Sequence, residues 1–330
     1  MKTAGIDVAA KTLAVVLSDG ATSGKAQEYA NSASGHQALV KALTRARVER
    51  ICLEATGAYH LDLALALDAA GLAVMVVNPK ASKRFAEALA TRNKSDAVDA
   101  GVLSEFAQRM PFERWQPPEA AALELRAIAR RLAALGELRT AAKNQLHAAS
   151  QSATTPEVVL DDLRLTITQC DAQIDTLRAW ACEKINAHKT LAAIYALLIS
   201  IKGIASASAI QIMGELLVLP ADMRAKQWVA QAGLDPRHST SGTSVNKKPR
   251  LSKAGNRYLR LALYMPALCA SRFEPQVKAY YQHLIEDRGL KKLQALCAVM
   301  RKLLHAIHGM LSTGTPFDGT RFYKQPEVAT

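Results

Sequence analysis

Residues 3–18, TAGIDVAAKTLAVVLS, decide the fold that we expect for the first part of the chain. They contain two β-rich runs, Thr3–Val8 and Thr12–Ser18, joined by a tight turn, which is the pattern of an antiparallel hairpin. Two later apolar runs, residues 48–54 (VERICLE) and 73–78 (AVMVVN), are typical of strands that are buried on both faces. The chain therefore begins with strands of which the first two are antiparallel.

Helical segments alternate with the later strands. Tyr59–Ala70 has the periodicity of a helix. Pro79 is expected to open a second helix, and Ser95 is expected to be the N-cap of a third helix that reaches Gln108. Antiparallel strands followed by a β-α-β-α order predict an α/β layer domain over residues 1–117.

The rest of the chain has a helical pattern. Residues 118–190 are rich in Ala, Leu, Glu, Arg and Gln, and they predict two long helices that turn near Ser152–Pro156 to form an antiparallel arm. The arm could be a helical linker or a dimerising coiled coil, since heptads alone do not decide between them. Residues 191–330 are expected to form a mostly helical domain, in which the polar stretch Gly233–Leu251 is expected to be a loop.

The chain is strongly basic. Lys and Arg number 42 against 29 Asp and Glu, which gives a net charge of +13. Between Ala225 and His305 there are 15 basic and 4 acidic residues, so this segment alone carries a surplus of 11. Such a surplus favours a polyanionic partner, either nucleic acid or an acidic membrane surface. Aromatic residues make up only 5%, which predicts contact with nucleic-acid backbones more than with stacked bases.

Composition also excludes several classes of protein. Apolar residues make up 49% of the chain, which is enough for real cores and excludes wholesale disorder. The five cysteines form no close pairs, so we expect free thiols in a reducing cytoplasm and neither a zinc site nor disulfides. The most apolar stretch, Leu191–Leu219, is interrupted by Lys202 and Glu215 and falls short of the roughly 20 clean residues of a membrane span. We therefore expect a soluble cytoplasmic protein.

Four carboxylates are arranged as a metal site would require. Asp7 lies at the end of the first strand, Glu54 ends a buried strand, and Asp96 and Asp99 share one face of a helix. Each alone has an ordinary explanation as a turn former, a helix cap or a first-turn carboxylate. Together they match the layout by which ribonuclease-H-like folds gather oxygen ligands around two Mg²⁺ ions at a phosphodiester. Five basic residues close to them in sequence are expected to meet backbone phosphates: Lys80, Lys83, Arg84, Arg92 and Lys94.

An alternative interpretation shares the same opening. Gly5-Ile6-Asp7, a hairpin turn and Lys11 also resemble the first phosphate loop of actin-like sugar kinases. Those proteins need a second glycine-rich phosphate loop and an adenosine motif. We find neither in the sequence, and the helical Asp-x-x-Asp has no place in that scheme, so the kinase is the weaker interpretation.

A second group of polar residues lies near the C-terminal third. Residues 237–260 (RHSTSGTSVNKKPRLSKAGNRYLR) carry no acidic residue, and their hydroxyls include those of Ser239, Thr240, Ser241 and Ser244. By chemistry alone, hydroxyls that bind phosphates are favoured over a nucleophilic serine, because His238 is the only nearby candidate for a base. The basic residues of this segment are expected to neutralise phosphates: Arg237, Lys247, Lys248, Arg250, Lys253, Arg257 and Arg260.

The two groups together resemble the insertion-sequence-110 family of transposases, also called bridge-RNA-guided recombinases, and the related Piv-type DNA invertases. The resemblance covers GIDVAAKTLAVVL, ICLEATGAYH and VMVVNPKASKRFAEALATRNKSDAVDAGVLSEFA near the N-terminus. Near the C-terminus it covers IKGIASASA, AQAGLDPRHSTSG, LSKAGNRYLRLALYMPAL and KKLQALCAVMRKLLHAIHGML. Both blocks in this order are highly specific, and they span essentially the whole chain.

The resemblance implies a domain plan and a set of site residues. It implies a RuvC-like domain (1–117), a coiled-coil arm (118–190) and a mostly helical transposase domain (191–330). The family's Asp-Glu-Asp-Asp set, which binds Mg²⁺ with Mn²⁺ as a possible substitute, falls on the four carboxylates described above: Asp7, Glu54, Asp96 and Asp99. The family's recombinase serine precedes the glycine of the Pro-Arg…Ser-Gly element, which makes it Ser241, with Ser239 and Ser244 as neighbouring alternatives.

The resemblance also implies an activity and its partners. A serine would attack donor and target DNA and hold a covalent 5′-phosphoserine while strands are exchanged. A structured noncoding guide RNA would pair with both DNAs, and homodimers would assemble into a tetramer. Two other hypotheses remain: a metal-dependent junction-resolving nuclease that uses water while the serine only binds DNA, and a non-enzymatic nucleic-acid-bridging protein. A tyrosine mechanism through Tyr258 or Tyr264 is less favoured, because the Arg…His-x-x-Arg framework is absent from the sequence.

Overall fold

The computed structural model describes residues 1–20, 22–89, 95–241 and 245–324, with the backbone alone for 238–241 and 245–248. The chain divides into two compact units, Met1–Pro117 and Pro118–Thr330.

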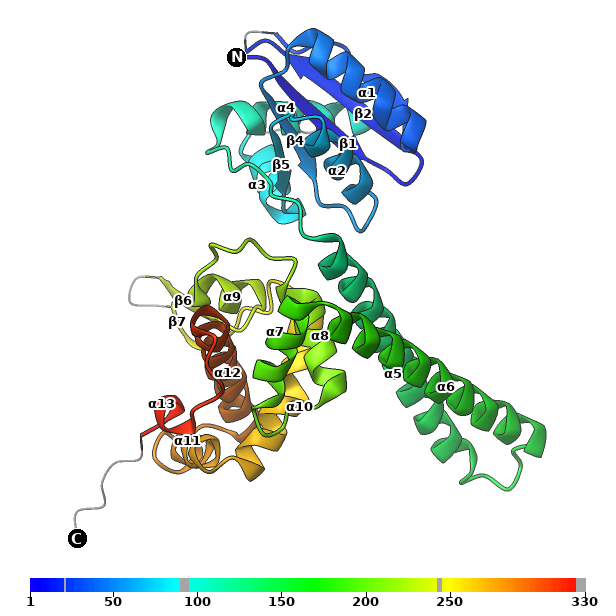
Figure 1. Cartoon of the computed structure of the whole chain (residues 1–330), viewed down its shortest axis with the longest axis vertical. Helices are drawn as coiled ribbons and strands as arrows, with labels where there is room; N and C mark the ends of the chain where they lie inside the picture. Colours follow the sequence, from blue (N-terminus) through cyan, green and yellow to red (C-terminus); the bar gives the residue numbers. More distant parts are fainter. Residues whose placement is uncertain (21, 90–94, 242–244, 325–330) are drawn as a thin grey trace. The chain divides into compact units, whose positions relative to one another are not determined.

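The first unit contains a five-stranded sheet of order β3-β2-β1-β4-β5 (Figure 1). The expected hairpin is confirmed, because β1 (Thr3–Val8) and β2 (Thr12–Ser18) pair antiparallel from Thr3–Ser18 to Val8–Leu13. β4 (Arg50–Glu54) and β5 (Val74–Val77) continue the sheet in parallel beyond β1. Three antiparallel strands followed by parallel ones are the order of a ribonuclease-H-like, RuvC-like domain, so the expected fold class is confirmed.

Helices cover both faces of this sheet. α1 (Ala33–Ala46) and α2 (Leu61–Ala69) pack with Ile51 and Leu53 of β4 on one face. α4 (Asp96–Arg109) packs with Cys52 on the other face, where Phe85 of α3 (Pro79–Ala88) also contacts it. Alternate residues of one strand therefore serve two separate cores, which requires apolar residues on both faces of the strand.

Capping residues and a proline mark the starts of α3 and α4. Pro79 is the first residue of α3 and Asn78 caps it, while the Ser95 side chain accepts from the Val98 N–H at the start of α4, as expected. β3 (Gln27–Ala30) and α1 were not predicted from the sequence. β3 is a four-residue, mostly exposed edge strand, so it shows little alternation of apolar and polar residues.

The second unit is mostly helical. Its antiparallel arm is confirmed, because α5 (Ala120–Ala149) and α6 (Glu157–Ala187) lie side by side and turn at residues 150–156 (Figure 1). Next come α7 (Lys189–Ile199), α8 (Ser206–Leu216), α9 (Ala225–Gln231), α10 (Arg257–Phe273), α11 (Pro275–Glu286), α12 (Lys292–Thr313) and α13 (Gly319–Phe322). One continuous apolar core joins the arm to the later helices.

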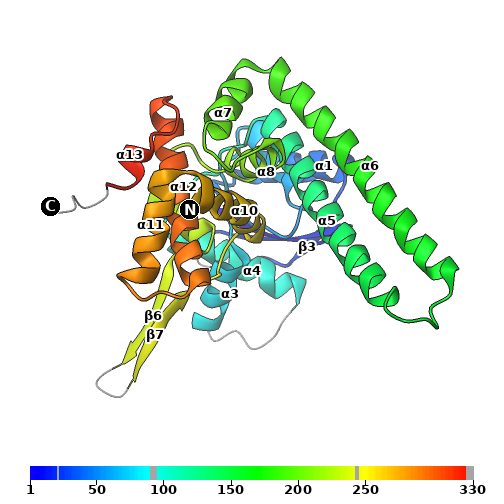
Figure 2. The same ribbon diagram turned by 90° about the horizontal axis from the view of Figure 1, so that it is seen from below.

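The loop expected over Gly233–Leu251 is wrong. β6 (Pro236–Ser241) and β7 (Val245–Leu251) form an antiparallel hairpin, which extends away from the helices of its unit in Figure 2. Pro236, Arg237, Pro249 and Arg250 of this ribbon are exposed, and its sequence is rich in polar residues and prolines, so it resembles that of a loop.

The cysteines and the most apolar helices were the subject of two expectations from composition. All five cysteines are free thiols, with Cys52 and Cys170 buried and the other three half-buried. Among the described residues, no helix combines the length and apolarity needed to cross a membrane.

Candidate functional site

Gly5 allows α4 to lie directly on β1. A Cβ atom at this position would stand 1.9 Å from the Ala100 carbonyl oxygen and 2.3 Å from the Ser104 nitrogen. Two residues earlier on β1, and on the same face, the Thr3 hydroxyl lies 2.8 Å from that of Ser104 and accepts from Gln108 Nε2 at 2.9 Å. Thr3 therefore faces the C-terminal half of α4 and Gly5 its middle, so the helix runs opposite to the strand. This direction brings the first turn of α4 to the end of β1 that carries Asp7.

Four carboxylates meet at this end of the sheet. The pKa of Asp7 is raised from 3.8 to about 6, first by burial and then by the negative charges of Asp96, Asp99 and Glu54. Asp96 and Asp99 lie in the first turn of α4, and Glu54 is the last residue of β4, next to β1 in the sheet. The four residues singled out in the sequence are thus electrostatic neighbours in the folded unit.

Two hydroxyl groups donate hydrogen bonds to Glu54, and neither was expected from the sequence. The buried Ser82 of α3 donates to Glu54 Oε2 at 2.6 Å, and Thr56 donates to Oε1 at 3.4 Å. Ser82 lies in the first turn of the helix that begins at Pro79, and its hydrogen bond to Glu54 shows that it faces the end of β4. The proline was a usable signal for the helix, but the partner of the hydroxyl depends on how α3 packs.

The chemistry of this donor set fits a hard divalent cation. Mg²⁺ and Mn²⁺ prefer carboxylate oxygens, and a cation would relieve the repulsion that raises the Asp7 pKa. Within the described ranges, no three acidic, histidine or cysteine side chains lie at metal-ligand distances. The carboxylates are therefore close enough to repel one another, but in the described residues they do not form a complete set of metal ligands.

Basic side chains lie on the helix that supports Glu54. Lys80, Lys83 and Arg84 are exposed on α3, on either side of the buried Ser82. Arg92 and Lys94 lie outside the described residues. The exposed part of α3 therefore offers positive charge close to the carboxylates, as a passing phosphate backbone would require.

The β6–β7 hairpin carries the candidate serine. Ser241 is the last residue of β6 and its backbone pairs with Val245, while Ser239 pairs with Lys247. The side chains of residues 238–248, which include Ser241, Ser244, Lys247 and Lys248, lie outside the described part of the structure. The structure thus places the backbone of the serine near the end of an exposed ribbon.

The basic residues of this segment fall into two groups. Arg237 and Arg250 face each other across the hairpin, and both are exposed, as is Lys253. Like charges directly opposite each other destabilise a ribbon, so a polyanion is the natural counterpart of this pair. By contrast, Arg257 is paired with Glu137 at 3.0 Å, and Arg260 donates to the Ala232 carbonyl at 2.8 Å.

A buried ionic cluster lies at the start of α10, the helix that follows the hairpin. Glu215 of α8 is 1% exposed and accepts from Arg130 Nε at 2.8 Å and Nη2 at 3.1 Å. Asn256, which follows the hairpin and caps α10, donates to the same carboxylate at 2.6 Å. The cluster thus joins α5, α8 and the start of α10.

Comparisons with known proteins agree with this arrangement. Family models described as "Transposase" and "Transposase IS116/IS110/IS902 family" match residues 4–153 and 195–282. The pilin gene-inverting proteins of Moraxella lacunata and Moraxella bovis are each 30% identical over 275 residues, which is 81% of this chain and 81% of theirs. A 43.6 kDa protein of insertion element IS110 from Streptomyces coelicolor is 31% identical over 87 residues, or 26% of this chain and 21% of that protein.

Solved structures of RuvC are similar to about a third of the chain. Thermus thermophilus RuvC in complex with a Holliday junction substrate matches 34% of this chain and 98% of its own, with 17% identity and a TM-score of 0.28. The family models and the long matches to the gene-inverting proteins identify the relationship without these structures. The chain therefore belongs to the IS110 family of DNA transposases.

Proposed function

We propose that this transposase is an RNA-guided serine recombinase, which cleaves and exchanges DNA strands through a covalent phosphoserine at Ser241. The observation that carries the proposal is the convergence of Glu54, Asp96 and Asp99 on Asp7 in a chain that also presents a serine on an exposed basic hairpin. Relatives named for inverting a pilin gene support recombination over simple DNA binding.

The proposed chemistry balances without a cofactor that is consumed. Ser241 Oγ forms a bond to the phosphorus of a DNA phosphodiester, and the bond from phosphorus to the 3′ oxygen breaks. The serine proton ends on that oxygen, which leaves a free 3′ hydroxyl and a 5′-phosphoserine. Attack by the 3′ hydroxyl of another strand reverses the step and rejoins the DNA. A divalent cation bound by Asp7, Glu54, Asp96 and Asp99, Mg²⁺ or Mn²⁺, would neutralise charge on the phosphodiester.

The partners in this proposal are donor DNA, target DNA and a structured noncoding guide RNA, on which homodimers assemble into a tetramer in the cytoplasm of a prokaryotic cell. The net charge of +13 supports contact with more than one phosphate backbone. The exposed pair Arg237 and Arg250 supports placing one such contact on the hairpin.

A denaturing gel tests the mechanism. Purified protein is incubated with Mg²⁺, RNA from the flank of the element, and donor DNA labelled on the strand that would keep the 5′ phosphate. We expect a protein–DNA adduct that resists denaturation, disappears in Ser241→Ala and Asp99→Ala, and persists in the matched variants Ser239→Ala and Ser244→Ala. Omission of the RNA is expected to abolish the adduct.

The second candidate, a junction-resolving nuclease that uses water, is distinguished by the same gel. It predicts cleavage without an adduct, preserved in Ser241→Ala and lost in Asp99→Ala. The carboxylate cluster supports it as the second candidate, because a divalent cation bound there would assist hydrolysis without the serine.

A further inference from the structure

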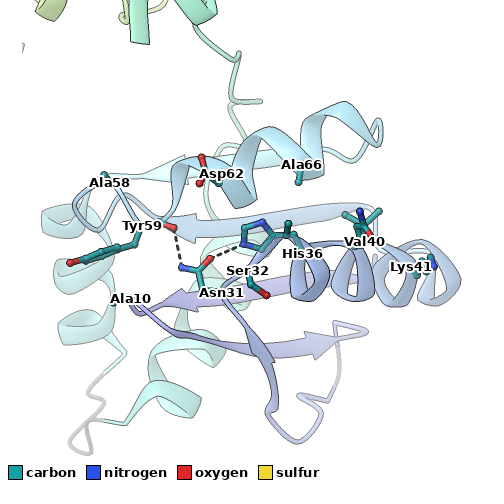
Figure 3. A pocket seen from close by; sticks show the side chains of 12 residues that line it. Ala10, Asn31, Ser32, His36, Val40, Lys41, Ala58, Tyr59, Asp62 and Ala66 are labelled. Carbon is teal, nitrogen blue, oxygen red and sulfur yellow. Dashed lines mark hydrogen bonds between the residues drawn. The ribbon is translucent and has the colours of Figure 1, made fainter. Parts of the chain in front are cut away.

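A single side chain joins the loops that follow Asp7 and Glu54. Asn31 Nδ2 donates to the carbonyl of Ala9, in the turn after β1, at 2.8 Å. It also donates to the carbonyl of Tyr59, in the segment after β4, at 3.1 Å (Figure 3). The two strand ends that carry candidate metal ligands are thus bridged by one amide from the residue after β3.

His36 fixes the orientation of this amide. Its Nε2 atom lies 2.7 Å from Asn31 Oδ1. Because the amide gives its hydrogens to two carbonyls, Oδ1 must accept, so His36 Nε2 carries the hydrogen. Burial lowers the His36 pKa, which favours the neutral ring with that hydrogen in place. Gly35 allows the first turn of α1, which carries His36, to lie against the end of β3, which precedes Asn31. A Cβ at Gly35 would stand 1.9 Å from the Ala30 carbonyl oxygen.

The sheet does not make this link itself. The β1–β4 ladder ends at the pair Ile6–Leu53, one residue before each carboxylate. Asp7 is instead registered with Ala14 of β2, and Glu54 with Val77 of β5. The sheet thus pairs the two strands directly up to Ile6 and Leu53, and the Asn31 bridge adds a constraint just beyond the two carboxylates.

The bridge also borders a cavity at the surface of the unit. Asn31 and His36 line a cavity of about 730 Å³ between α1 and α2, with Tyr59 and Asp62 at its wall (Figure 3). Hydrogen bonds at such a surface can be altered without opening the core of the unit.

We propose that Asn31 and His36 are positioning residues, which set the distance between Asp7 and Glu54 and thereby the affinity of the carboxylate site for a divalent cation. The inference rests on the proposed function in one respect, namely that these carboxylates bind the cation.

The test measures Mn²⁺ binding to the DNA-free full chain by titration calorimetry. Asn31→Ala is expected to raise the Mn²⁺ dissociation constant by about tenfold or more, within the range for residues that orient metal ligands. His36→Ala, which leaves both carbonyl contacts available, is expected to have a smaller effect that His36→Gln partly reverses.

Gln108→Ala is the matched control. The Gln108 amide also donates two hydrogen bonds, to Thr3 and Ser18 at 2.9 Å each, but at the opposite end of the β1–β2 hairpin. The Gln108→Ala variant should have its melting temperature lowered about as much as that of Asn31→Ala, while its Mn²⁺ affinity should stay unchanged.

Asp7→Ala separates the two possible failures. If it abolishes Mn²⁺ binding while Asn31→Ala and His36→Ala match Gln108→Ala, the positioning role is overturned and the metal site stands. If Asp7→Ala leaves Mn²⁺ affinity unchanged, the proposed metal site and the positioning role both fail.

Discussion

Replacing Asp7 by Asn is expected to stabilise the metal-free Met1–Pro117 unit at neutral pH while weakening its metal binding. The wild-type carboxyl group has its pKa raised from 3.8 to about 6 by burial and by Asp96, Asp99 and Glu54. One pKa unit corresponds to about 1.4 kcal/mol, so ionising this group in the folded unit costs up to about 3 kcal/mol. Because the side chain is only partly buried, we expect about 1 to 2 kcal/mol.

The sign of the pH dependence follows from the raised pKa. Below about pH 4 the carboxyl group is protonated in both the folded and the unfolded chain, so it contributes no difference. Between about pH 4 and 6 the unfolded chain releases the proton while the folded unit retains it, so the free energy of unfolding falls as pH rises. Above about pH 6 the full penalty is present. Asn cannot ionise, so the variant and the wild type should have similar stability at pH 4 and diverge by pH 7.

Urea unfolding of the full chain in EDTA, at pH values from 4 to 8, measures this difference. Hydrogen–deuterium exchange of peptides from β1 and α4 follows the first unit separately from the second. Glu28→Gln, an equal change of charge at an exposed position of β3, is the control and should show no such divergence. A constant difference between Asp7→Asn and wild type across this pH range, or no stabilisation at pH 7, would refute the electrostatic reasoning.

Three further predictions concern other parts of the molecule. Gly5→Ala places a Cβ 1.9 Å from the backbone of α4, so it should lower the free energy of unfolding in urea by about 1 to 3 kcal/mol or more. It should also reduce Mn²⁺ affinity, and an unchanged affinity would contradict the role of this contact. Arg130→Met removes the contacting ion-pair partner of the buried Glu215 carboxylate and should lower the free energy of unfolding by about 3 kcal/mol. Much of this loss should be recovered in the double variant with Glu215→Leu; an additive loss would contradict this. DNA affinity, measured by fluorescence anisotropy, should fall at least about 100-fold from 50 to 200 mM salt. Arg250→Gln should reduce the slope of the logarithm of affinity against the logarithm of salt concentration by about 1. An affinity that does not change with salt would argue against contact with the DNA backbone.

Local chemistry explains why much of the fold was predictable. The hairpin of Thr3–Ser18 and the starts of α3 and α4 depend on residues within a few positions of one another, such as Pro79 and Ser95. The long helices of the arm follow from a composition that strongly favours helices. By contrast, β3 and the β6–β7 hairpin were missed, because short exposed strands carry little periodic signal.

The candidate site divides in the same way. Asp7, Glu54, Asp96 and Asp99 could be selected from the sequence, because each stands at a strand end or in a first helical turn. The residues that orient them could not be selected. Ser82 contacts a carboxylate 28 positions away, and Asn31 bridges carbonyls 22 positions before it and 28 positions after it.

The sequence by itself therefore determined the fold class, the family and the identity of the candidate catalytic residues, since these depend on local patterns and on motifs. Only the tertiary structure decided that α4 lies on Gly5, that burial and three neighbouring carboxylates raise the Asp7 pKa, and that Asn31 and His36 tie two loops together. The physical reason is that backbone contact, electrostatic repulsion and hydrogen bonding depend on separation in space, which the packing of the sheet and its helices sets.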